Sequence, residues 1–129
     1  MKVTTFLMFT GQAEKAMALY TSVFPGSRIE SMDRYGAEEP GREGTVKRAI
    51  LDLYGTRLMC VDSPPVHAFS FTPSISLFVD CDSEAGLDQA FGRLGEEGQV
   101  LMPAGDYGFS RRFAWVQDRF GVSWQLNLP

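Results

Sequence analysis

The chain has 129 residues, which suits a single domain, and its 44% hydrophobic and 22% charged residues are ordinary proportions for a soluble globular protein. The net charge of −4 disfavours nucleic acid as a partner, because phosphate binding needs a basic surface. No apolar run is long enough to span a membrane, and residues 1–16 lack the pattern of a signal peptide, so we expect a cytoplasmic protein without a membrane partner.

The chain begins with the pattern of a strand followed by a helix. Residues 3–9 are rich in β-branched and aromatic side chains, which predicts a strand. The helix is expected to be capped by Thr10 or Gly11 and to end at Pro25 and Gly26. Its apolar residues recur at helical spacing and predict one buried stripe: Ala13, Ala16, Met17, Tyr20, Val23 and Phe24.

Three further strands are predicted in the first half of the chain. Residues 27–35 form the first, and a polar, glycine-rich loop at 36–44 follows it. Residues 45–54 and 57–61 then predict a hairpin around Gly55 and Thr56.

The same order of elements returns in the second half. Residues 74–80 predict a strand, and Asp82 or Ser83 is expected to cap a helix whose buried stripe is Leu87, Ala90, Phe91 and Leu94. Three more strands are expected within 99–107, 109–118 and 122–128.

The predicted fold is therefore a single α+β domain over residues 1–129, built from two βαβββ modules, 1–62 and 74–129, joined by a proline-rich linker at 63–73. In each module one helix would cover one face of a mostly antiparallel sheet and leave the other face bare. Two bare faces set side by side would make one curved sheet around a cleft, which is the natural ligand site.

Residues with reactive side chains are few. Cys60 and Cys81 have no metal-binding spacing and lie in or beside apolar strands, so we expect both to be reduced and structural. The single histidine, His67, lies in the linker without a recognisable partner, which favours a surface or packing role over a metal ligand. No nucleophile–base pair is visible.

Several stretches together resemble the vicinal oxygen chelate superfamily, which includes glyoxalase I, bleomycin-resistance proteins and extradiol dioxygenases. They are "LYTSVFPGSRI", "LMCVDSPP", "ISLFVDCDSE", "VLMPAGDYGFS" and "WVQDRFGVSWQ", and they look like the PhnB-like branch, over the whole chain. That branch often has the label 3-demethylubiquinone-9 3-methyltransferase. A methyltransferase using S-adenosylmethionine ordinarily needs a glycine-rich strand-to-helix turn in a parallel sheet, and no such turn is visible here.

The resemblance also implies four positions where the superfamily places metal ligands, namely Thr5, Met59, Ser74 and Gln125. Typical ligands there are His, Glu or Gln, and a catalytic divalent metal needs about three protein ligands. Only Gln125 suits that role, so we expect no metal and no other cofactor, with a divalent metal as the less favoured reading.

Without a metal, the cleft side chains would decide the function. Strand alternation predicts a mixed aromatic and polar set with aliphatic Leu7 and Ile50 among them, and its candidate ligand-binding residues are Thr5, Arg48, Asp52, Arg57, Met59, Ser74, Ser76, Phe113, Trp115, Gln117, Ser123 and Gln125. Arg48 and Arg57 could hold a carboxylate or phosphate, or could instead pair with Asp52 or face solvent. Trp115 could line the cleft or a dimer interface, whereas Trp124 alternates with Gln125 and is expected in the core.

Three functional readings follow. A metal-free module that binds an unknown small molecule is favoured by the depleted ligand set. The alternatives are an enzyme, of the metal-dependent lyase, isomerase or dioxygenase type or metal-free, and a structural dimer with a collapsed cavity. A homodimer is expected in any case, because one module of this size buries too little apolar surface alone, and Phe69 and Phe71 would be costly to expose.

Overall fold

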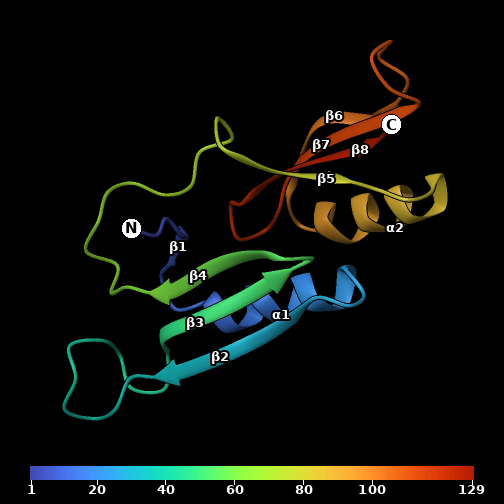
Figure 1. The fold of residues 1–129 in the computed structure, drawn as a ribbon. Coiled ribbons are helices and arrows are strands. Elements are labelled where there is room, and N and C mark those ends of the chain that lie inside the picture. Colours follow the sequence, from blue (N-terminus) through green and yellow to red (C-terminus); the bar gives the residue numbers. More distant parts are fainter. The chain divides into compact units, whose positions relative to one another are not determined.

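The structure is a computed structural model that describes residues 1–129, and it divides into two compact units, Met1–Ala68 and Phe69–Pro129 (Figure 1). Each unit contains one helix and four strands in the order βαβββ. The predicted α+β class and the duplicated βαβββ pattern are therefore confirmed. No helix is both long and apolar enough to cross a membrane.

The first unit is a four-stranded sheet with one helix packed against it. Its elements are β1 (Thr5–Phe9), α1 (Ala13–Val23), β2 (Arg28–Arg34), β3 (Val46–Leu53) and β4 (Thr56–Asp62). The strand order is β1-β4-β3-β2, in which β1 runs parallel to β4 and the other neighbours are antiparallel (Figure 1).

The second unit repeats this arrangement. Its elements are β5 (Ser76–Asp80), α2 (Glu84–Gly95), β6 (Gln99–Gly105), β7 (Arg112–Gln117) and β8 (Ser123–Leu128). The strand order is β5-β8-β7-β6, and the parallel pair is again the first strand of the unit with the last.

The start of α1 differs from the prediction. Its N-cap residue is Gln12, which makes no side-chain capping bond, rather than Thr10 or Gly11. The carboxylate of Asp62, at the end of β4, instead accepts hydrogen bonds from the backbone N–H groups of Gly11 (2.9 Å) and Ala13 (3.0 Å). The cap is thus supplied by a residue distant in sequence, which local capping rules do not consider.

The start of α2 follows the local rule. Ser83 is the N-cap, and its hydroxyl accepts a hydrogen bond from the Gly86 N–H at 3.0 Å. In the β3–β4 hairpin the turn residues are Tyr54 and Gly55, not Gly55 and Thr56, with φ of 53° and 91°. Two successive residues with positive φ are typical of the tight turn that matches strand twist.

The core of each unit lies between its helix and one face of its sheet. In the first unit β3 and β4 alternate, so that Ala49, Leu51, Leu58 and Cys60 are fully buried against α1. Burial raises the pKa of the Cys60 thiol to about 12, so the thiol remains protonated at neutral pH.

In the second unit Val116, Trp124 and Leu126 are fully buried beneath α2, as predicted for Trp124. The face of each sheet opposite its own helix, here called the open face, has no element of its own unit upon it. Residues on the open faces are the candidates for function.

Candidate functional site

Register decides which side chains share the open face of the first unit. Met59 on β4 pairs with Ile50 on β3, and Arg57 pairs with Asp52. Because directly paired residues lie on the same side of a sheet, these four belong together, opposite the buried Leu58 and Cys60. The predicted alternation of side chains between the two faces of β3 and β4 is therefore confirmed.

The prediction for β1 is shifted by one residue. Thr5 pairs with Leu58 and Leu7 with Cys60, which places both on the helix side, and Leu7 is buried. Phe6 pairs with Met59 and takes the position on the open face that had been assigned to Thr5. Residues 3–9 are apolar or β-branched almost throughout, so their alternation could not establish the register.

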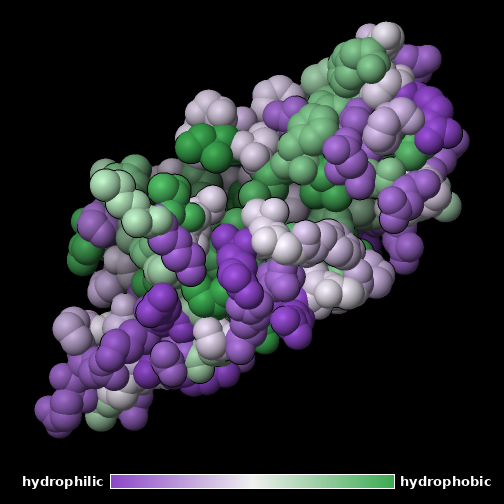
Figure 2. Space-filling view, viewed as in Figure 1, coloured by the Kyte–Doolittle hydropathy of each residue, from purple (hydrophilic) through white to green (hydrophobic).

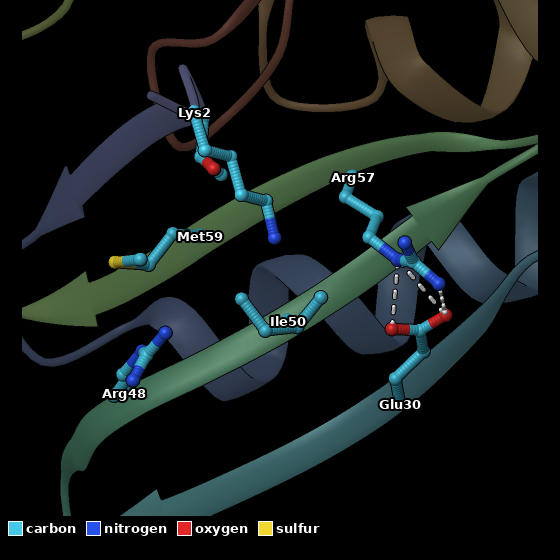
Figure 3. A pocket seen from close by; sticks show the side chains of 7 residues that line it. Lys2, Glu30, Arg48, Ile50, Arg57 and Met59 are labelled. Carbon is cyan, nitrogen blue, oxygen red and sulfur yellow. Dashed lines mark hydrogen bonds and ion pairs between the residues drawn. The ribbon is translucent and has the colours of Figure 1, made fainter.

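A hollow of about 180 Å³ lies on this open face (Figure 3). We call it the cationic hollow, because three of its lining residues are basic and one is acidic. Its lining is Lys2, Thr4, Glu30, Arg48, Ile50, Arg57 and Met59.

One arginine of the hollow is held by an ion pair. The Arg57 Nε donates to both carboxylate oxygens of Glu30, at 3.2 and 3.0 Å, and Nη2 donates to Oε1 at 3.1 Å. These bonds and the charge of Glu30 raise the pKa of Arg57. Asp52, the partner considered from the sequence, instead accepts a hydrogen bond from the Gly55 N–H at 2.7 Å and lies 3.9 Å from Arg28.

The open face of the second unit contains a chain of polar side chains. The Gln125 amide donates to the Ser76 hydroxyl at 3.1 Å, the Ser76 and Ser123 hydroxyls lie 2.7 Å apart, and the Trp115 Nε1–H donates to Ser123 at 2.8 Å. Ser123 is buried, whereas Gln125 and Trp115 are half-buried. The structure therefore brings together these four predicted residues. The Gln117 amide is satisfied separately, by the Gly121 carbonyl at 2.9 Å.

Beside this polar chain lies an aromatic cluster. Phe113 is only 4% exposed, and its ring centroid lies 5.0 Å from Phe109, 6.1 Å from Tyr107 and 6.4 Å from Phe78. Phe78 and Phe109 are 56% and 62% exposed. The sequence prediction included Phe113 but missed the other three, although Phe78 lies two residues after Ser76 in the same strand, shares its face, and could have been found by that signal.

Ser74 does not occupy the predicted place. It is exposed in the turn before β5, where its hydroxyl lies 3.1 Å from that of Thr72. Gln125 is paired across the parallel strands with Phe78. The strand begins two residues later than expected, because residues 72–75 form a turn closed by the Ile75 N–H and the Thr72 carbonyl at 3.3 Å.

The side chains at the superfamily's ligand positions do not suit a divalent metal ion. The structurally paired positions hold Phe6 with Met59 and Phe78 with Gln125. Among these four only Gln125 offers an oxygen ligand, and a thioether is too soft for magnesium, manganese or calcium. No group of three or more His, Cys, Asp or Glu side chains in the chain could hold a metal ion. His67 is exposed between β4 and β5.

Comparison with known proteins gives consistent results. The family described as 3-demethylubiquinone-9 3-methyltransferase matches residues 1–127. A PhnB protein from Bacillus cereus is 50% identical, with 100% of both chains covered and a TM-score of 0.95. Protein PA1353 from Pseudomonas aeruginosa is 28% identical over 99% of this chain and 97% of that one, with a TM-score of 0.86.

More distant structures share the fold alone. Lactoylglutathione lyase from Agrobacterium tumefaciens is 16% identical over 99% of this chain and 92% of that one, with a TM-score of 0.56. No curated protein matches the sequence. The chain thus belongs to the family described as 3-demethylubiquinone-9 3-methyltransferase, the PhnB-like branch of the vicinal oxygen chelate superfamily, with its glyoxalase-type fold.

Proposed function

We propose that the protein binds a small organic molecule on the open faces of its sheets and does so without a metal ion. The observation that carries the proposal is the open face of the second unit, where an exposed aromatic cluster adjoins a hydrogen-bonded polar chain. Aromatic walls with a few fixed polar groups are the usual composition of a small-molecule site.

The polar chain supports binding because it orients Gln125. Its amide nitrogen donates to the Ser76 hydroxyl, which is hydrogen-bonded to Ser123, and Ser123 in turn accepts a hydrogen bond from the Trp115 Nε1–H. The Gln125 amide oxygen accepts no hydrogen bond from the chain and is available to a donor on a ligand. Phe78, which pairs with Gln125 across the sheet, offers an exposed ring on which a planar ligand can stack.

The alternative is a metal-dependent enzyme of the lyase, isomerase or dioxygenase type with an atypical ligand set. It would require water or substrate to supply the ligands that Phe6, Met59 and Phe78 do not. Methyl transfer is not proposed from the family description, since no glycine-rich turn for S-adenosylmethionine is present in the sequence.

Binding can be measured with benzamide, a planar probe with an amide donor. We expect benzamide to change the fluorescence of Trp115, which is half-buried on the open face, and the change to be absent in Trp115→Phe, where only the buried Trp124 emits. Phe78→Ala should weaken binding about threefold to tenfold, because one aromatic contact contributes roughly 0.5–1.5 kcal/mol. Val100→Ala, which shortens an exposed apolar side chain of the same unit on the side of the sheet that faces α2, is the matched control.

Equal affinities in Phe78→Ala and the unchanged protein would contradict the proposal. Metal analysis of protein purified without chelator provides a separate check, for which we expect well under one metal ion per chain. A stoichiometric transition metal that is lost in Gln125→Ala would support the enzyme alternative instead.

We also propose that the protein is a two-fold symmetric homodimer. Support comes from apolar side chains that are exposed in the single chain, among them Val66 at 74%, Phe69 at 66% and Ile75 at 73%. Figure 2 shows hydrophobic residues at the surface among hydrophilic ones. Large exposed apolar groups are more often found where another protein surface covers them.

Light scattering after size exclusion tests the dimer. The expected mass is twice that of the 14.3 kDa chain, and Phe69→Asp is expected to dissociate it, because a carboxylate is costly to bury at an apolar contact. Ala37→Asp adds the same charge to the exposed loop and should leave the mass doubled. A mass near 14.3 kDa for the unchanged protein would refute the dimer.

A further inference from the structure

The cationic hollow has a charge opposite to that of the whole chain. The chain has a net charge of −4, yet Lys2, Arg48 and Arg57 against Glu30 leave the lining of the hollow with +2. These residues come from the N-terminal segment and three different strands, so the folding of the sheet, and not a local basic run, brings the charges together (Figure 3). Such a local field attracts anions even to an acidic protein.

Two of the cations are available to a ligand. The side chains of Lys2 and Arg48 make no hydrogen bond and no ion pair with the chain, and Asp33, which pairs with Arg48 across the strands, forms no ion pair with its guanidinium. Glu30 occupies only Nε and Nη2 of Arg57, so Nη1 remains free to donate. Glu30 therefore orients Arg57 without using all its donors.

The floor of the hollow is apolar. Ile50 and Met59 are directly paired across β3 and β4, and both are half-buried (Figure 3). A volume of about 180 Å³ is about six times the roughly 30 Å³ that one water molecule occupies in the liquid. The hollow thus has room for a small molecule with an acidic group and a short hydrocarbon part.

We infer that the cationic hollow binds a small organic anion. Its carboxylate or phosphate group is held by Lys2, Arg48 and the free edge of Arg57, and its hydrocarbon part lies on Ile50 and Met59. Arginine suits this role because its planar donors match the oxygens of carboxylate and phosphate. The inference deepens the function proposed above by naming a ligand class for the open face of the first unit, and its test does not depend on Phe78 or Trp115, so the two can fail separately.

Nuclear magnetic resonance at constant ionic strength tests the inference, with acetate, hexanoate, inorganic phosphate and hexanol as separate probes. We expect saturable shifts in the Arg48 and Arg57 amides and in the Ile50 and Met59 methyl groups. Hexanoate should bind more tightly than acetate because of the apolar floor, phosphate should bind through charge alone, and hexanol should not saturate. Higher salt should weaken all binding.

The decisive variant is Arg48→Gln, which removes one free cation from an exposed position of β3 and should weaken hexanoate binding about tenfold, or about 1.4 kcal/mol. Arg42→Gln removes the same charge from the exposed loop of the same unit and should have no effect. The inference is overturned by unsaturable shifts, by equal binding of hexanol and hexanoate, by binding of phosphate without hexanoate, or by equal losses in the two variants.

Discussion

Replacing Asp62 with alanine is expected to lower the free energy of unfolding by roughly 3–5 kcal/mol, because each buried donor left without an acceptor costs about 1–3 kcal/mol. Asp62 is buried, with only 2% of the residue exposed, and its carboxylate accepts three backbone hydrogen bonds. They come from Gly11 and Ala13 at the start of α1 and from Val46 at the start of β3, at 2.9, 3.0 and 2.9 Å. One carboxylate therefore joins three elements of the first unit.

Urea unfolding followed by circular dichroism measures the loss, and hydrogen exchange at the Ala13 and Val46 amides shows where it acts. Asp62→Asn keeps the shape but exchanges one accepting oxygen for a donor, so its loss should be intermediate. Asp33→Asn, which alters an exposed carboxylate of the same unit, should change stability by less than about 0.5 kcal/mol. If Asp62→Ala cost less than about 1 kcal/mol, water would be satisfying the three donors and the argument would fail.

Trp124→Ala should have a comparable effect in the second unit. Trp124 is the largest fully buried side chain there, and its Nε1–H donates to Asp118 at 2.9 Å. Removal of a buried tryptophan leaves a cavity, and such changes cost about 3–5 kcal/mol. Asp118 would keep its bonds from the Phe120 and Val122 N–H groups, at 2.9 and 3.1 Å, so the loop before β8 should persist.

The midpoint of urea unfolding, again followed by circular dichroism, measures this effect. We expect the midpoint to fall while the slope of the unfolding free energy against urea concentration stays the same. Trp124→Phe retains most of the ring and loses the bond to Asp118, so its loss should be clearly smaller. Trp115→Phe, on the half-buried open face, provides the matched control and should cost least. Equal losses for Trp124→Ala and Trp115→Phe would contradict the assignment of Trp124 to the core.

Much of the fold could be predicted from periodicity and turn chemistry. The duplicated βαβββ pattern, the Ser83 cap and the buried side of β8 follow from local signals that tertiary packing does not override. Gly55 and Gly121 have positive φ and mark the turns before β4 and β8. Each turn fixes where the next strand starts, so the faces of the residues after it follow from the sequence. These features depend on neighbours in sequence.

The tertiary structure decided the features that depend on partners far away in sequence. The register of β1 needed its pairing with β4, because residues 3–9 show no clear alternation. Asp62 caps a helix that begins about fifty residues earlier, and Glu30 rather than Asp52 holds Arg57. The composition and strand periods thus determined the architecture and most open-face positions, whereas the cationic hollow exists only because the sheet brings Lys2, Arg48 and Arg57 together.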